Sequence, residues 1–405
     1  MEPTFRRAFN AAFTDAMYEE FLHRFEARAG CGPIPFRVAE TPFFVPVALR
    51  DSLERAASEI VEQISNPAVI ERMKGAIPPR FFVPGMDPLP NCVQVDFAIV
   101  RGPSGELEGK VVELQAFPSL YALELLHLEV LNEQFQSVPG LERRWSLFFG
   151  GLTQERYVEW LKRTILGGED PEAVVLLDLQ PQKQKTYADF VATKEFVGID
   201  SVCPTELLRE GRKLFRRGPD GRLIQVRRFY NRVVFDELEV KQVKLPFEYT
   251  DDLDVTWCSH PNWYWIWSKY TLPHIDHPAV PKARYVSQID KLPEDLSKYV
   301  LKPLFSFAGT GVRVDVKPED VEGIPAEQRG SWLLQEKIAY DPGLLMPDGS
   351  GVKAELRVMF LRAPDEEKPK PVINLVRLSR GKMHGVDHNR DLTWVGGTIG
   401  IWPED

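Results

Sequence analysis

A lysine interrupts an apolar strand pattern near the start of the last quarter of the chain. The stretch YVLKPLFSFAGTGVRVDV predicts a strand that carries Lys302, a loop of small residues from Ser306 to Gly311, and an alternating second strand over 312–316. Gly309 and Gly311 would let backbone N–H groups approach phosphate oxygens, and Lys302 would add a fixed positive charge. A plain hairpin with a surface lysine has the same pattern. The stretch therefore leaves two hypotheses open, a nucleotide triphosphate site and an ordinary hairpin.

The first third of the chain changes from helical to strand periodicity. Residues 15–28 and 48–66 predict amphipathic helices, because apolar positions recur there at helical spacing. Two strands are expected at 92–100 and 110–114, joined by the turn-rich segment RGPSGELEG. A long helix should then begin at Ser119, with that serine available as its cap.

From about residue 146 helical and strand patterns alternate. Such alternation predicts a small α/β unit with a parallel sheet. A charged hairpin is expected at 213–235, and the chain after residue 261 is mostly strands and turns. The alternating elements are a helix at 153–165, a strand at 173–179, a helix at 186–195, a short strand before Cys203 and a helix at 204–209.

Composition excludes several classes of protein. A chain of 405 residues exceeds what one hydrophobic core usually serves, so two or three units are expected. The net charge of -9 argues against a general nucleic-acid binder. No segment approaches the about 20 consecutive apolar residues of a membrane span, so we expect a cytoplasmic protein without a membrane partner. The cysteines lie far apart without a CxxC pair and are interpreted as reduced, buried thiols: Cys31, Cys92, Cys203 and Cys258.

Acidic and amide side chains mark the two strands on either side of RGPSGELEG. Asp96 lies in VDFAIV, and Glu113 and Gln115 lie in VVELQAF. Since Glu113 and Gln115 are two residues apart, both project from one face of their strand. Two carboxylates and an amide oxygen on one sheet face suit Mg²⁺. A solvated sheet face would have a similar pattern.

These stretches together resemble a known superfamily. The common phosphate-binding motifs GxxxxGK[ST] and GxGxxG are absent. The ordered set VDFAIV, VELQAFPSL, VLKPLFSFAGTGV and LLQEKIAY resembles the ATP-grasp superfamily. Because the acidic residues come well before the lysine and glycine loop, the order resembles the circularly permuted branch, to which glutathionylspermidine synthetases belong. The resemblance covers about 90–120 and 170–400, without a cysteine-nucleophile amidase domain.

The resemblance implies ATP and Mg²⁺ as cofactors. Lys302 matches the strand lysine that touches ATP phosphates, and the loop from Ser306 to Gly311 matches the one that closes over them. Lys269, in WSKYTLP, matches a second nucleotide lysine. The implied nucleotide-binding residues are Lys269, Lys302, Ser306, Gly309, Gly311, Gln335, Glu336 and Lys337, and the implied metal ligands are Asp96, Glu113 and Gln115.

Two positions depart from the family pattern. Gln115 stands where the family usually has Asn, and its side chain is one methylene longer. Gln94 stands where glutathionylspermidine synthetases have an arginine. These changes put the second metal and a substrate or phosphate contact in doubt.

The expected fold class is α/β in the α+β sense, namely a circularly permuted ATP-grasp fold with a small parallel-sheet subdomain. Residues 1–145 would supply the N-terminal helices and the metal-binding strands. Residues 146–245 would form the substrate-side α/β subdomain, and residues 246–405 the nucleotide-binding region.

The expected function is an ATP-dependent ligase that joins a small carboxylate to an amine through an acylphosphate. Arginines suit the clamping of a carboxylate or acylphosphate, because a planar fork grips two oxygens. Arg232, Arg357 and Arg377 are the catalytic candidates, and a cross-strand ion pair is the alternative for each. Glu355 and Asn374 are weaker metal or ribose candidates. A small-molecule phosphotransferase and a catalytically silent nucleotide-binding module are the alternative functions.

Two further clusters are given no site role. His384, Asp387 and His388 lie in a glycine-containing tail that favours a loop, so no metal ligand is assigned there. The aromatic segment NWYWIWSK at 262–269 is interpreted as core packing rather than base stacking.

Overall fold

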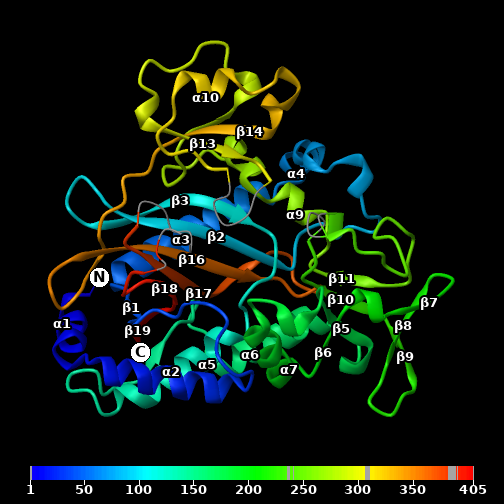
Figure 1. Ribbon diagram of the computed structural model, residues 1–405, viewed down its shortest axis with the longest axis horizontal. Coiled ribbons are helices and arrows are strands. Elements are labelled where there is room, and N and C mark those ends of the chain that lie inside the picture. Colours follow the sequence, from blue (N-terminus) through cyan, green and yellow to red (C-terminus); the bar gives the residue numbers. More distant parts are fainter. Residues whose placement is uncertain are drawn as a thin grey trace.

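A long antiparallel sheet forms the centre of the molecule (Figure 1). The computed structural model describes residues 2–234, 238–239, 241–305, 311–381, 389 and 391–404. Strands far apart in sequence are neighbours in this main sheet, since β2 (Cys92–Arg101) pairs not only with β3 (Leu107–Gln115) but also with β16 (Gly351–Leu361). In spatial order the strands are β18 (Gly396–Thr398), β17 (Lys370–Ser379), β16 (Gly351–Leu361), β2 (Cys92–Arg101) and β3 (Leu107–Gln115), with β15 (Leu344–Leu345) paired to β16.

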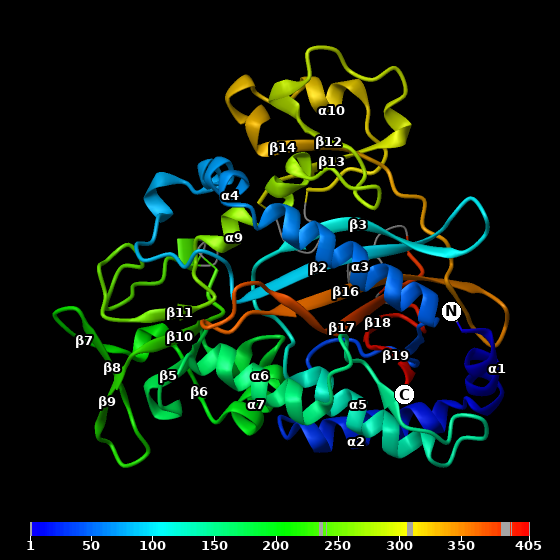
Figure 2. The same cartoon turned by 180° about the vertical axis from the view of Figure 1, so that it is seen from behind.

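Helix α3 (Val47–Ile64) covers one face of the main sheet, as the view from behind shows (Figure 2). Its apolar side is buried, including Leu53 and Ile60, because these positions recur at helical spacing. The helix predicted at 48–66 and the two strands of the predicted hairpin are thus confirmed. The side chains that bear on function project from the opposite face.

The predicted parallel sheet is present. Its four strands run in the order β11 (Thr256–Cys258), β10 (Arg228–Asn231), β5 (Val174–Leu177) and β6 (Asp200–Val202), and all three pairings are parallel. Strand β5 has the sequence VVLL and is buried throughout, as expected for a strand covered on both faces. The helices expected at 153–165 and 186–195 are α6 (Gln154–Leu166) and α7 (Tyr187–Val197).

Three local predictions are wrong here. The helix expected at 204–209 is only a turn of 3₁₀ helix, Pro204–Glu206, followed by strand β7 (Leu208–Glu210). Pairing of β7 with β8 (Lys213–Arg217) overrides the helical pattern. The hairpin expected at 213–235 ends with β9 (Leu223–Val226), because the chain then enters β10 of the parallel sheet. The strand expected at 312–316 is reduced to a single bridge between Leu301 and Arg313.

A small antiparallel sheet lies above the main sheet in Figure 1 and has a hydrophobic cluster of its own. Strand β14 is central and pairs with the other two strands. The elements of this part are β12 (Ala283–Tyr285), β13 (Tyr299–Pro303), β14 (Trp332–Glu336) and helix α10 (Pro318–Glu322).

Helices α1 (Pro3–Ala12), α2 (Asp15–Ala29) and α5 (Leu123–Phe135) pack below the main sheet. Helix α5 starts four residues after Ser119, and its N-cap position, Ala122, makes no side-chain cap bond. The carboxylate of Asp189 on α7 instead accepts the N–H groups of Leu120, Ala122 and Leu123. The prediction of Ser119 as cap is therefore wrong, since a carboxylate from another helix satisfies these donors.

The remaining elements are short. They include helices α4 (Pro67–Met73) and α9 (Trp263–Ile266) and a sheet of β1 (Phe43–Phe44), β19 (Gly400–Pro403) and β4 (Trp145–Ser146). Trp263, Trp265 and Trp267 are buried, which confirms the core interpretation of the aromatic segment. All four cysteines are unpaired, and three are buried, whereas Cys31 is half-exposed. No helix in the described part of the chain combines the length and apolarity that crossing a bilayer requires.

Candidate active site

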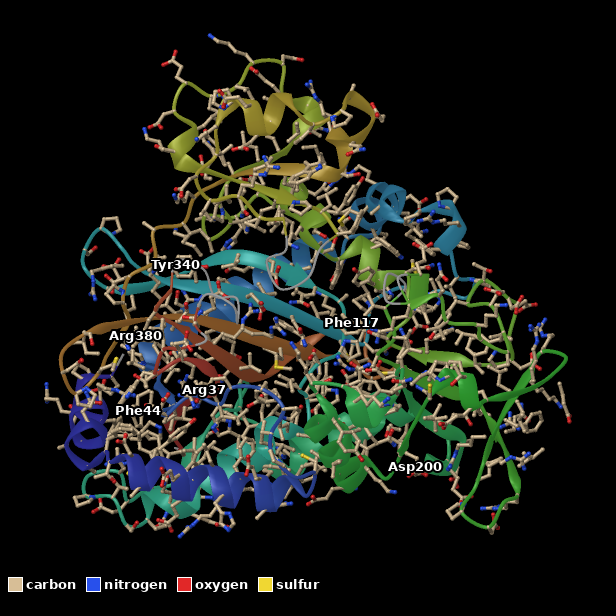
Figure 3. All side chains as sticks on the ribbon, in the orientation of Figure 1. Arg37, Phe44, Phe117, Asp200, Tyr340 and Arg380 are labelled. Atoms are coloured by element: carbon tan, nitrogen blue, oxygen red, sulfur yellow. The ribbon has the colours of Figure 1, made fainter. Side chains whose placement is uncertain are left out.

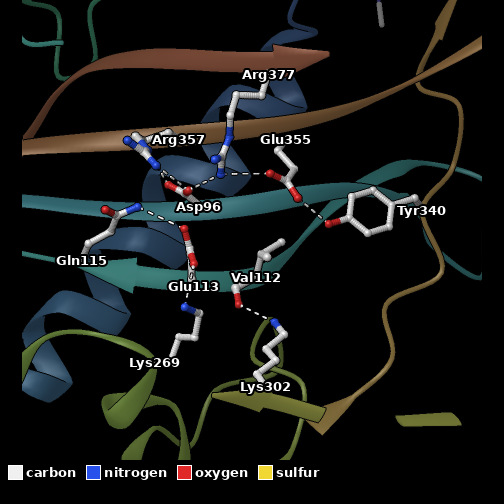
Figure 4. A network of polar contacts seen from close by, with 10 residues as sticks. All are labelled: Asp96, Val112, Glu113, Gln115, Lys269, Lys302, Tyr340, Glu355, Arg357 and Arg377. Atoms are coloured by element: carbon white, nitrogen blue, oxygen red, sulfur yellow. Dashed lines mark hydrogen bonds and ion pairs between the residues drawn. The ribbon is translucent and has the colours of Figure 1, made fainter. Parts of the chain in front are cut away.

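A β-bulge sets the geometry of the acidic residues on β2 and β3. Asp96 pairs with Glu113, but the next residue, Phe97, pairs with Val111, so Val112 is the extra residue of the bulge. Asp96 and Glu113 therefore project together from the face opposite α3 (Figure 4). The amide nitrogen of Gln115 donates to Glu113 Oε1 over 3.1 Å. The predicted set Asp96, Glu113 and Gln115 is thus brought together.

Two arginines from the neighbouring strands converge on Asp96. Arg357 lies directly opposite Asp96 across the β16–β2 pairing and donates from Nε to Oδ1 over 2.6 Å and from Nη2 to Oδ2 over 2.8 Å. Arg377 Nη2 donates to Oδ2 over 2.6 Å and lies 3.0 Å from Glu355 Oε2. Burial by itself would raise the pKa of Asp96, but the two guanidinium groups outweigh it and lower that pKa.

Tyr340 completes this network, and the sequence analysis missed it. Its hydroxyl donates to Glu355 Oε1. Burial, together with the charge of Glu355, raises the pKa of Tyr340 well above its ordinary value, so it remains a hydrogen-bond donor. The signal was present in the sequence, because Tyr340 ends the stretch LLQEKIAY just after the β14 strand.

Two lysines approach the acidic residues from outside the main sheet. Lys302 projects from β13 and donates to the carbonyl oxygen of Val112, the bulge residue, over 3.1 Å. Lys269 Nζ lies 3.9 Å from Glu113 Oε2. Both lysines are buried, and burial lowers the pKa of Lys302 to about 8 although the nearby Glu113 opposes this. A buried ammonium with a depressed pKa favours the arrival of an anion.

This pKa predicts how anion binding depends on pH. A phosphate group would bind the protonated form of Lys302, and the fraction of that form falls by about tenfold between pH 7 and pH 9 if the pKa is about 8. We therefore expect the affinity for a non-hydrolysable ATP analogue to fall by about tenfold over that range, with proton uptake on binding. Calorimetric titrations at constant ionic strength check this. A flat profile, or the same slope in Lys302→Met, would contradict the assignment.

Gln335 has the clearest unsatisfied polar group in the small sheet. Its side chain is fully buried, and neither amide atom has a hydrogen-bond partner in the part of the chain that the structure describes. Since Lys302 pairs with Leu333 and Gln335 is two residues further along β14, Gln335 projects from the same face as Lys302. An orphaned amide beside a buried ammonium indicates a site for a polar ligand.

The other predicted nucleotide residues lie along or beside β14. Glu336 accepts the backbone N–H of Lys282, and Lys337 donates to the carbonyl of Val314. An open groove of about 720 Å³ lies between the main sheet and the small sheet and borders residues 336–339. Ser306 and Gly309 lie outside the described residues, whereas Gly311 has a φ of 76°.

Arg232 lies at a different place from Arg357 and Arg377. It follows the carboxyl end of β10, donates to Thr186 Oγ1 over 3.1 Å and stacks over Phe117 at 4.9 Å from the ring centroid. Phe117 lies where the main sheet meets the parallel sheet (Figure 3). Within the described residues, Nε and Nη1 of Arg232 have no partner. The structure therefore brings together two of the three predicted arginines, with Arg232 set apart from them.

Of the two weaker metal or ribose candidates, Glu355 lies in the site and Asn374 does not. Glu355 belongs to the network through Arg377 and Tyr340. Asn374 lies on the opposite face of β17 and bonds to Leu147 and Gly400, so it joins β17 to β19 instead. Gln94, the second departure from the family pattern, is buried and donates to the carbonyl of Ser119.

The donor set fits a metal ion only in part. Glu113 accepts from a neutral amide, and the amide oxygen of Gln115 points away from it, so both could turn oxygens to Mg²⁺ (Figure 4). Asp96 has both oxygens bonded to guanidinium groups. Among the described residues there is no group of three His, Cys, Asp or Glu side chains that could hold a metal by itself. His384, Asp387 and His388 lie outside the described residues.

Comparison with known proteins identifies the fold. No protein-family model and no curated protein matches this chain. A solved structure does match: the apo form of a glutathione synthetase-like effector, GSS30, from Globodera pallida. The match covers 95% of this chain and 96% of that chain, with a TM-score of 0.57 and 11% sequence identity.

The protein thus has a glutathione synthetase-like ATP-grasp fold. This fold agrees with the resemblance to the ATP-grasp superfamily, and the mixed α/β class with a parallel sheet is confirmed. At 11% identity the likeness shows the fold alone, so the roles of single residues stay predictions.

Proposed function

We propose that this protein is an ATP-dependent ligase that joins a small carboxylate to an amine through an acylphosphate, with a circularly permuted ATP-grasp core. One observation carries the proposal. Two buried lysines reach β3 from outside the main sheet, Lys269 at the carboxylate of Glu113 and Lys302 at the backbone carbonyl of Val112. An orphaned buried amide, that of Gln335, projects from β14 on the face that carries Lys302. A polyanion with a polar base would satisfy the lysines and the amide together.

Each residue of the site then has a separate task. Lys302 and Lys269 bind the phosphates, and Gln335, on the face of Lys302, binds the adenosine. Glu336 and Lys337 border the groove beside it. Glu113 and Gln115 would hold Mg²⁺, which would neutralise charge on the phosphates when it is bound.

The arginines act on the carboxylate and phosphoryl oxygens. Arg377 keeps about a third of its side chain exposed and is fixed by carboxylates on two sides, so its orientation is set before a ligand arrives. In the first step a carboxylate oxygen attacks the γ-phosphorus and ADP leaves. In the second step an amine attacks the acyl carbon, loses a proton, and phosphate leaves with one oxygen of the original carboxylate.

The oxygen balance provides the test. Carboxylic acids labelled with ¹⁸O would be incubated with ATP, Mg²⁺ and a panel of amines, and the products analysed by mass spectrometry. We expect ADP, an amide and phosphate that carries one ¹⁸O, and no amide without an amine. A phosphorylated acceptor without an amide would support the phosphotransferase alternative. Nucleotide binding without turnover across the panel would support the silent module.

A further inference from the structure

Asp96 is the most enclosed carboxylate of the site. Its side chain is 1% exposed, whereas that of Glu113 is 25% exposed. Arg357 engages both carboxylate oxygens as a planar fork, and Arg377 adds a third charged donor. Charge-assisted bonds of this kind are about twice as strong as neutral ones, and the paired fork also sets the direction of the guanidinium plane.

A metal ion would compete poorly for these oxygens. Mg²⁺ binds oxygen at about 2.0–2.1 Å, and beside Asp96 it would sit against two positive guanidinium groups. Freeing an oxygen would strand the buried charge of Arg357, whose side chain is 9% exposed. Glu113 requires less rearrangement, because Oε1 accepts a hydrogen bond from the neutral amide of Gln115, and Lys269 Nζ lies 3.9 Å from Oε2, beyond hydrogen-bond distance.

The formal charge of the site also argues against a metal ion at Asp96. The site has one more cation than carboxylates before a ligand binds, which gives it a formal charge of +1. Its three carboxylates are Asp96, Glu113 and Glu355, and its four cations are Lys269, Lys302, Arg357 and Arg377.

We propose that Asp96 binds no metal and instead acts as a positioning residue, which holds Arg357 and Arg377 as a guanidinium pair for the oxygens of the transferring phosphoryl group. The inference rests on the proposed ligase function. The backbone supports it, because Arg357 faces Asp96 across one strand pair and Arg377 faces Glu355 across the next. Strand register thus places both arginines on the face that carries Glu113.

The first arm of the test measures metal affinity. Mn²⁺ would be titrated into the protein with the ATP analogue AMP-PNP, and free Mn²⁺ read by electron paramagnetic resonance. Glu113→Gln should weaken Mn²⁺ binding by at least ~30-fold, within the range seen when metal sites lose supporting groups. Asp96→Asn should change it by less than about threefold. An Asp96 that ligates the metal would give equal losses in the two variants.

The second arm measures retention of ADP with Mg²⁺ and aluminium fluoride, which mimics a phosphoryl group in transfer. Asp96→Asn should weaken this complex by ~100-fold, as expected when a preorganised donor to the transition state is lost. A merely structural role of Asp96 would weaken AMP-PNP and the aluminium fluoride complex alike.

A second variant separates the loss of the arginine pair from a general loss of folding. Asp96→Asn leaves two arginines without their carboxylate, whereas Asp96→Asn/Arg357→Gln removes one charge of each sign. We expect this double variant to bind Mn²⁺ and AMP-PNP like the unaltered protein and to lose the aluminium fluoride complex. Loss of Mn²⁺ binding in the double variant overturns the inference, and so does full retention of both complexes. If the unaltered protein binds no AMP-PNP with Mn²⁺, the proposed function fails and takes the inference with it.

Discussion

Replacing Lys302 with methionine is expected to abolish most of the affinity for ATP. Methionine keeps an apolar stem of similar length, so the buried position on β13 stays filled while the charge is removed. Truncating a buried, charged contact of this kind costs about 2–4 kcal/mol of binding free energy. That corresponds to a dissociation constant that is roughly 30- to 1,000-fold larger, which calorimetry with a non-hydrolysable ATP analogue would measure.

The matched control for this variant is Lys298→Met. Lys298 is the last residue of the 3₁₀ turn Leu296–Lys298, immediately ahead of β13, and its side chain is 76% exposed. Its contact with Asp295 is a surface ion pair, which contributes little. We expect unchanged ATP affinity in this variant. Equal affinities in the Lys302 and Lys298 variants would show that the buried lysine does not bind phosphate, and the ligase proposal would lose its main support.

Replacing Asp189 with alanine is expected to cause the largest loss of stability. The carboxylate accepts three backbone N–H groups at the start of α5, and one of them belongs to Leu120, which has a φ of 61°. A leucine in this left-handed region needs support from its surroundings. Each donor left without a partner costs about 1–3 kcal/mol, so the three donors together correspond to a loss of about 3–9 kcal/mol in the free energy of unfolding.

Urea unfolding followed by circular dichroism would measure this effect. Ser119→Ala is the control, because the serine side chain was predicted from sequence to cap the same helix. It should change the free energy of unfolding by less than about 0.5 kcal/mol. A larger loss in Ser119→Ala than in Asp189→Ala would restore the serine as the cap and contradict the structure.

Several elements could be predicted from the sequence because their signals are local. The periodicity that defines α2 and α3 lies within each helix, and the two strands of the β2–β3 hairpin are separated by a recognisable turn. Lys302, Glu113 and Gln115 could likewise be chosen as site candidates, because their residue types and strand context stand out in short stretches.

Other features depended on partners remote in sequence. The sequence pattern around β7 predicts a helix, and only the pairing with β8 makes this segment a strand. The bulge at Val112 brings Glu113 opposite Asp96, and no residue type in this stretch predicts the bulge. The engagement of Asp96 by Arg357 and Arg377 joins positions more than two hundred residues apart.

By itself, then, the amino-acid order determined the helical and strand periods, the chemistry available at each position and the superfamily that the motifs resemble. Only the tertiary structure decided which carboxylate is exposed and which is enclosed by arginines. The physical reason is that periodicity depends on neighbours along the chain, whereas the environment of a charge depends on whatever the folded sheet places within a few ångströms of it.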